Sequence, residues 1–228
     1  FEDMHSKIEF ILTQKLGDLG KKIHTARSRN DQVLVSIHLY LKKEISEIKS
    51  LINDFFKLLI SLAKKNKDKL LPGYTHFQVA MPSSFGLWFS AYAESLIDDV
   101  TLFNAVQKIV DQNPLGSAAG FGSSFPINRE TTTKALDFGD LKYNVIAAQM
   151  SRGKAEKLIS NAIASLSATL AKMAYDICLY MGQDHNFISF PEKLTTGSSI
   201  MPHKKNPDVF ELIRGKGNML QGLPNQLA

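Results

Sequence analysis

Cysteine is nearly absent from the sequence, since Cys178 is the only one among 228 residues. One thiol cannot form an internal disulfide, and a chain without disulfides fits a reducing compartment, so we expect a cytoplasmic location. Cys178 lies within a helical pattern, where a small buried residue is a better interpretation than a catalytic nucleophile.

Signals for membrane insertion and secretion are also missing. The uncharged run over residues 70–93 is long enough to raise the question of a membrane span. Pro72, Gly73 and Pro82 interrupt it, so we do not expect a spanning helix. Residues 1–3 include two acidic side chains and lack the basic stretch of a signal peptide. They are typical of the interior of a longer sequence.

Several signatures of cofactor and nucleophile chemistry are missing as well. The segment Gly120-Phe121-Gly122 lacks the third glycine of a dinucleotide-binding loop, and no predicted strand precedes it. The sequence has neither a Walker loop nor a His-Glu-x-x-His motif, and its six histidines are too dispersed to suggest a metal site. Ser123 does not lie in a nucleophile elbow. We therefore expect neither a metal nor a cofactor.

Charge is only mildly positive, with a formal net charge of +5. A basic chain can bind nucleic acid, but here the lysines are scattered along one predicted helix and its end. This distribution favours a solvated helix face over a phosphate-binding stripe, so no nucleic acid and no membrane partner is expected, whereas small anionic substrates would be attracted. The lysines concerned are Lys42, Lys43, Lys49, Lys57, Lys64, Lys65 and Lys69.

Long helical patterns dominate the sequence. Apolar residues recur every three or four positions over residues 33–62 and 159–180, and the second stretch alternates strictly, as in the seam of a left-handed helical bundle. A third helical stretch, roughly 83–111, is richer in aromatic residues. No run shows the alternation typical of a strand. The predicted fold class is therefore all-α, a bundle of long helices.

Helices of this length need partners along their whole length. About 30 residues span roughly 45 Å, which exceeds the usual helix of a globular protein. Asp98, Asp99 and Lys108 are expected to give the aromatic-rich helix a polar side, but its other faces are apolar. We therefore expect the bundle to continue into neighbouring subunits.

Three polar breaks between the helices are the candidate places for chemistry. Residues 197–207 (Gly-Ser-Ser-Ile-Met-Pro-His-Lys-Lys-Asn-Pro) gather hydroxyl, ammonium and amide groups ahead of a helix, and Pro207 suits its first turn. Residues 73–78 surround His76, and residues 25–31 hold two arginines that would suit carboxylates. A surface loop, a satisfied histidine and a helix cap are the alternative interpretations of these three breaks.

The first of these breaks resembles the signature loop of the fumarase/aspartase superfamily, whose members release fumarate from succinyl compounds. Within that superfamily, the stretches HTARSRNDQV, PGYTHFQ and PDVFELIRGK resemble argininosuccinate lyases. The resemblance implies that residues 1–228 form the central helical-bundle domain of the superfamily, with part of the preceding N-terminal region at residues 1–25. The N-terminal and C-terminal segments of the family would lie beyond the two ends.

The resemblance also implies a reaction and an assembly. The reaction would be anti elimination of argininosuccinate to arginine and fumarate, reversible and without a cofactor, in a homotetramer whose sites are shared between subunits. Two positions depart from the family: it usually has glutamine at His203 and glycine at Ala26. A histidine at position 203 is more typical of adenylosuccinate lyases, which provide one alternative. A non-catalytic, crystallin-like homologue is the other.

The family's functional residues can be carried over position by position. Ser198 matches the catalytic base, with Lys204 and backbone amides of its loop stabilising the alkoxide. His76 matches the second catalytic residue, an acid or its relay, and Glu211 matches the carboxylate that would orient its ring. The implied substrate-binding residues are Ser28, Arg29, Asn30, Thr75, Asn206 and Met201.

Overall fold

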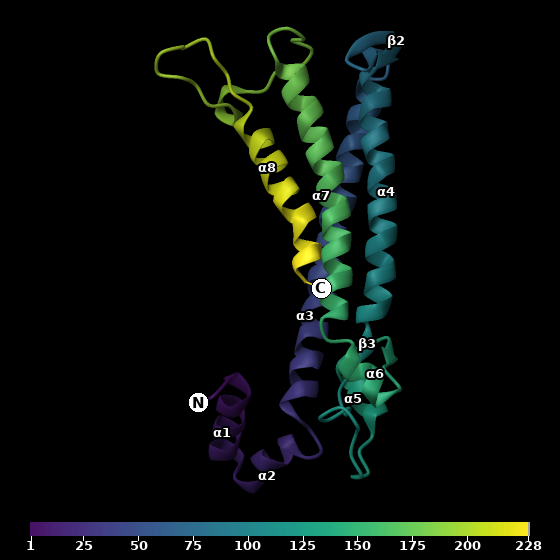
Figure 1. Ribbon diagram of the computed structural model, residues 1–228, viewed down its shortest axis with the longest axis vertical. Helices are drawn as coiled ribbons and strands as arrows, with labels where there is room; N and C mark the ends of the chain where they lie inside the picture. The colour runs from purple at the N-terminus through teal and green to yellow at the C-terminus, as the bar shows by residue number, and fades with distance from the viewer. Residues whose placement is uncertain (228) are drawn as a thin grey trace. The chain divides into compact units, whose positions relative to one another are not determined.

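Helices dominate the fold, as the periodicity predicts (Figure 1). The structure, a computed structural model, describes residues 1–227. Its α-helices are α1 (Met4–Leu16), α2 (Asp18–Lys21), α3 (Arg29–Lys65), α4 (Phe85–Val110), α5 (Arg129–Ala135), α6 (Val145–Met150), α7 (Lys154–Met181) and α8 (Asp208–Gly222). Short 3-10 helices cover Lys22–His24, Glu192–Leu194 and Leu223–Gln226.

The chain divides into two compact units. The first comprises residues 1–46 and 105–156, and the second comprises residues 47–104 and the chain from 157 onward. The three long helices α3, α4 and α7 each contribute residues to both units. The all-α fold class is confirmed.

Within residues 1–227, four short strands are the exception to this class. β1 (Leu70–Thr75) pairs antiparallel with β2 (Gln78–Ser84), and β3 (Gln112–Asn113) pairs in parallel with β4 (Asp140–Leu141). The expectation that no strand occurs was therefore wrong. The β1–β2 hairpin buries only Leu71, so its pairing rests on backbone hydrogen bonds, and no alternation of apolar and polar residues marks it. Because of this hairpin, α4 begins at Phe85 and not near residue 83.

The core of the second unit holds α4 against α7 through a buried carboxylate. Asp99 is 2% exposed, and its two oxygens accept hydrogen bonds from Ser165 Oγ (2.7 Å) and Thr169 Oγ1 (2.8 Å) on α7. Asp99 was expected to contribute to a polar side of α4, and its polar partners are hydroxyl groups of α7. Its burial is tolerated because both oxygens have donors.

A second carboxylate joins the same two helices from the α7 side. Asp176 accepts hydrogen bonds from Trp88 Nε1 (3.0 Å) and from the Tyr92 hydroxyl (2.6 Å). Burial raises the pKa of the Tyr92 hydroxyl, and the bond to Asp176 acts in the same direction. Tyr92 therefore remains a neutral donor to Asp176 at physiological pH.

The first unit contains another departure from the predicted surface. Lys42 was assigned to a solvated helix face, but its side chain is only 22% exposed and its ammonium lies 2.7 Å from Asp111 Oδ1. Asp111 Oδ1 also accepts the backbone N–H of Gly139 at 3.0 Å. This ion pair links α3 to the segment that follows α4.

Among the described helices, α7 is long and apolar enough by length and composition to cross a membrane. The core helix of a bundle passes the same test. The hydrogen bonds through Asp99 and Asp176 pack α7 against α4, although only 28% of its most apolar stretch is buried within the described residues. The uncharged run over residues 70–93 is interrupted by the β1–β2 hairpin, as its prolines indicated.

Ala26 provides a test of backbone strain. It has a φ of 55°, in the left-handed region that disfavours a Cβ atom. Ala26→Gly should stabilise the complete protein by up to about 1 kcal/mol, because relief of strain outweighs the extra freedom of the unfolded glycine. The matched control is Ala168→Gly within α7, which should destabilise it by about 1 kcal/mol. Denaturant titration of both variants measures the two effects, and a loss of stability in Ala26→Gly would contradict the assignment of strain.

Candidate active site

The N-terminus of α3 is capped by side chains of its own first residues. The Ser28 N–H donates to Asp31 Oδ1 (2.9 Å), and the Asn30 N–H donates to Ser28 Oγ (3.2 Å). This is a capping box with aspartate in the position of the usual glutamate. The helix-cap interpretation of this break is therefore correct. Any substrate that binds Ser28 would share a hydroxyl that already accepts one N–H.

Asp31 also ties this helix end to a distant loop. Its second oxygen accepts the backbone N–H groups of Gly116 and Ala118, each at 3.0 Å, and the residue is 0% exposed. The sequence interpretation did not single out Asp31. The available signal was its position three residues after a serine at a helix start. This carboxylate positions Arg29 and Asn30 relative to the loop that follows β3.

Arg29 is occupied by acidic residues of its own chain. Its guanidinium lies 2.7 Å from Glu2 Oε2 and 3.1 Å from Asp3 Oδ2, and it donates to Ser6 Oγ at 2.5 Å. The hydrogen bond to Glu2 and the nearby carboxylates raise the pKa of the guanidinium. A substrate carboxylate would have to displace one of these partners. Asn30, beside it, is exposed.

His76 lies at the tip of the β1–β2 hairpin. Thr75 pairs with Gln78, so His76 and Phe77 form a two-residue turn, and their φ values are 54° and 60°. Two positive φ values are the requirement of a type I′ turn, which glycine or asparagine usually occupies. Thr75 and His76 are both exposed. Strained non-glycine residues of this kind cluster at functional sites.

The loop that carries Ser198 is closed at its base. Thr196 and Asn206 exchange two backbone hydrogen bonds of 3.2 and 2.8 Å. Inside the loop, Ser198 Oγ accepts the backbone N–H groups of Ile200 (3.4 Å) and Met201 (3.3 Å). The side chain of Lys204 is exposed. The predicted backbone support for the Ser198 oxygen is thus present in the structure.

The hairpin and this loop lie at the same end of the second unit (Figure 1). The Tyr74 ring contacts the rings of His185 and Phe187, just beyond the end of α7, at centroid distances of 5.7 and 6.5 Å. The hairpin is therefore anchored beside the segment that leads into the Ser198 loop.

The catalytic candidates are not joined within one chain. In residues 1–227, no hydrogen bond or ion pair links His76, Ser198, Lys204 and Glu211 to one another. Glu211 is exposed on α8, and its N–H donates to the carbonyl of Pro207 (3.1 Å). Pro207 itself precedes the helix, which begins at Asp208 and not at the proline as predicted.

Comparison with known proteins settles the family. The sequence model described as "Lyase" matches residues 2–222. The chain belongs to this lyase family. A curated relative named argininosuccinate lyase from Parabacteroides distasonis is 59% identical over 226 residues, which are 99% of this chain and 51% of the relative. One of the same name from Stenotrophomonas maltophilia (strain K279a) is 45% identical, over 94% of this chain and 50% of the relative.

This lyase chain therefore spans about half the length of the curated relatives it matches. The predicted resemblance to argininosuccinate lyases is confirmed. Among solved structures, an EDDS lyase in complex with formate has a TM-score of 0.89 at 25% identity, over 94% of this chain and 43% of that one. A fumarate lyase:delta crystallin from Brucella melitensis bound to cobalt has a TM-score of 0.81 at 20% identity, over 94% and 48%, which shows the shared fold.

The role of Asp31 in this lyase can be tested by removing its charge. Asp31→Asn weakens three hydrogen bonds to a buried carboxylate and should lower the free energy of unfolding by about 3 kcal/mol. It should also speed hydrogen exchange of the Gly116 and Ala118 amides. Asp54→Asn is the matched control, since Asp54 lies 3.8 Å from Lys57 on the exposed side of α3. That exposed pair should contribute less than about 1 kcal/mol. Equal effects of the two substitutions would contradict the role of Asp31.

Proposed function

We propose that the complete protein cleaves argininosuccinate to arginine and fumarate, by anti elimination and without a cofactor. The observation that carries this proposal is the environment of Ser198, whose hydroxyl oxygen accepts two backbone N–H groups in a closed loop beside Lys204. The relatives named argininosuccinate lyase, at 45 to 59% identity, support the choice of substrate.

Ser198 acts as the base that removes the proton next to a succinyl carboxylate. A neutral hydroxyl is a weak base, so its alkoxide form must be stabilised. The N–H groups of Ile200 and Met201 already point at this oxygen, and hydrogen bonds of this kind become stronger when the acceptor is charged. The Lys204 ammonium adds positive charge to the same loop and would also stabilise the doubly negative carboxylate intermediate.

The remaining residues bind the substrate and protonate the leaving nitrogen. His76 is exposed at a hairpin tip, where it can donate to the leaving nitrogen, and Glu211 orients its ring. Thr75 and Asn30 present exposed polar side chains to the carboxylates, and Arg29 joins them after exchanging an acidic partner. The other two contacts are Asn206, whose amide lies 3.5 Å from Thr196 Oγ1, and Met201, which is partly exposed.

The alternatives are not favoured. The relatives described above carry the name argininosuccinate lyase, so His203 alone does not shift the assignment to adenylosuccinate. A crystallin-like structural role would not require Ser198, Lys204 and His76 together in strained or closed loops. We also place the protein in the cytoplasm, in agreement with its single cysteine.

The assembly that we propose is a homotetramer whose sites are shared between subunits. Large apolar side chains are exposed on the long helices of the second unit, among them Leu51 (70%) and Leu58 (52%) on α3 and Leu87 (64%) on α4. Extended apolar faces of this kind are typical of protein interfaces. Each chain would then supply His76 or Ser198 to sites that it does not complete alone.

Light scattering of the complete protein at micromolar concentration should give the mass of a tetramer. Leu58→Lys should shift the population toward smaller species, because it places a charge in an apolar interface. Lys64→Gln, on the exposed end of the same helix, is the control and should leave the mass unchanged. A monomeric mass for the wild-type protein would contradict the assembly.

Ser198→Ala tests the chemistry. The substitution removes proton abstraction, so turnover of argininosuccinate should fall by at least about a hundredfold. Substrate affinity should change little, because the hydroxyl acts mainly in the transition state. Ser199→Ala is the matched control at a neighbouring exposed hydroxyl and should retain near-normal turnover. His76→Asn should also slow turnover and largely preserve binding.

Single-turnover rates and substrate affinities of the complete protein separate these effects. Near-normal turnover in Ser198→Ala would remove Ser198 from the base role and transfer it to His76. Release of fumarate from adenylosuccinate, and none from argininosuccinate, would contradict the proposed substrate.

A further inference from the structure

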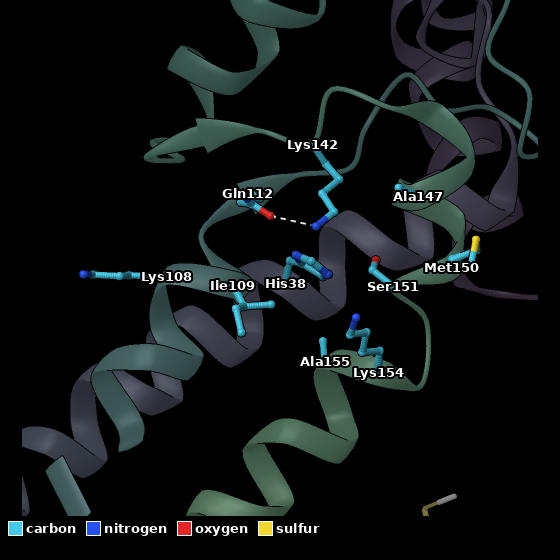
Figure 2. A pocket seen from close by; sticks show the side chains of 10 residues that line it. All are labelled: His38, Lys108, Ile109, Gln112, Lys142, Ala147, Met150, Ser151, Lys154 and Ala155. Atoms are coloured by element: carbon cyan, nitrogen blue, oxygen red, sulfur yellow. Dashed lines mark hydrogen bonds between the residues drawn. The ribbon is translucent and has the colours of Figure 1, made fainter. Parts of the chain in front are cut away.

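A cavity within the first unit is not explained by the proposed lyase reaction. It has a volume of about 500 Å³ and lies between α3, the end of α4, α6 and the first turn of α7 (Figure 2). None of the residues that line it belongs to the candidate active site. Its lining includes lysines but no aspartate or glutamate, and its walls are largely apolar, with Ile109, Ala147, Met150 and Ala155.

His38 lies in the wall of this cavity with one nitrogen unsatisfied. The residue is 2% exposed, and its Nδ1 lies 2.9 Å from the carbonyl oxygen of Val110. A carbonyl only accepts, so Nδ1 carries the proton and the neutral ring has a lone pair on Nε2. Within residues 1–227, Nε2 has no hydrogen-bond partner. A buried acceptor left in this state is costly, so a ligand that donates to it gains affinity.

Burial is the main reason why the His38 ring stays neutral. Burial lowers the pKa of His38, and the nearby Lys142 ammonium acts in the same direction. The backbone carbonyls of Val110 and Gln112 and the charge of Glu156 act in the opposite direction, but the pKa of His38 is lowered on balance. Nε2 is therefore an acceptor at neutral pH, and its ligand must bring a donor.

Positive charge lies beside this acceptor. Figure 2 shows Lys142 and Lys154 extending toward the His38 ring, whereas Lys108 points away from it. Lys142 donates to Gln112 Oε1 at 2.9 Å, which leaves further N–H donors on its ammonium. Lys154 and Ala155 are the first two residues of α7, so the positive end of a 28-residue helix dipole borders the cavity.

We propose that this cavity binds a phosphate group that carries an O–H, either free phosphate or the singly protonated form of a phosphomonoester. Its anionic oxygens accept hydrogen bonds from Lys142 and Lys154, and its O–H donates to His38 Nε2. The apolar walls and the volume leave room for the organic part of an ester. Sulfate is a poor substitute, because at neutral pH all its oxygens are acceptors and one of them would face the lone pair of His38.

Calorimetric titration of the complete protein with inorganic phosphate, glycerol 3-phosphate and sodium sulfate tests this proposal. Phosphate should bind saturably and at least about tenfold more tightly than sulfate, since sulfate cannot satisfy the buried acceptor. Tighter binding of glycerol 3-phosphate than of phosphate identifies a phosphomonoester as the ligand, and the reverse order identifies free phosphate.

Two variants and a control locate the site. Lys154→Gln removes a cation whose side chain makes no hydrogen bond or ion pair within residues 1–227, and it should weaken phosphate binding by at least about tenfold. His38→Leu should abolish the preference for phosphate over sulfate, and circular dichroism checks that this variant folds. Lys134→Gln, an equal loss of charge on the exposed side of α5, should bind phosphate as the wild type does. Equal affinities for sulfate and phosphate, or wild-type affinity in Lys154→Gln, would overturn the proposal.

Discussion

The buried carboxylate of Asp31 is the interaction on which the first unit depends. Two segments donate to it: Ser28 at the start of α3, and the loop at Gly116, which lies 85 residues after Asp31 in sequence. Without this carboxylate, the buried N–H of Gly116 and the partly buried N–H groups of Ser28 and Ala118 would lose their acceptor, which costs free energy. One side chain therefore caps a helix, closes a loop and fixes the position of Arg29 and Asn30.

In the second unit, Asp99 and Asp176 determine how α4 and α7 pack against each other. Apolar seams repeat along a helix, so two long helices can pack in several registers that bury similar surface. A carboxylate that accepts hydrogen bonds from particular hydroxyl and indole groups is satisfied in only one of these registers. Asp99 binds Ser165 and Thr169, and Asp176 binds Trp88 and Tyr92, so α4 and α7 have a defined register. With the helices fixed, the hairpin and the Ser198 loop occupy defined positions at their ends.

The sequence predicted the helices well because their apolar period is strong over many turns. It did not predict the β1–β2 hairpin, because a hairpin held by backbone bonds with little burial leaves no alternating pattern. The burial of Asp99 and the pairing of Lys42 were not predicted, for a different reason. A charge on a helix predicts solvent until its partner is known, and the partners here lie 66 and 69 residues away in sequence.

The candidate site was predictable in part. The resemblance of the 197–207 loop to the superfamily's signature loop implied support of Ser198 by backbone amides, and the N–H groups of Ile200 and Met201 donate to its hydroxyl oxygen. The engagement of Arg29 with Glu2 and Asp3 was not predictable, since nothing in the spacing joins α3 to the chain's first residues. His38 was overlooked because a lone histidine in a helical pattern gives no sign of burial or of an unpaired nitrogen.

The central claim is that different subunits bring His76 and Ser198 to one site, and subunit mixing tests it most directly. His76→Asn and Ser198→Ala proteins, each nearly inactive alone, are denatured together and refolded as an equal mixture. If the two residues of a site come from different chains, about a quarter of the sites regain both wild-type residues, and fumarate release returns accordingly. Activity of the mixture no higher than that of either variant alone would contradict the claim.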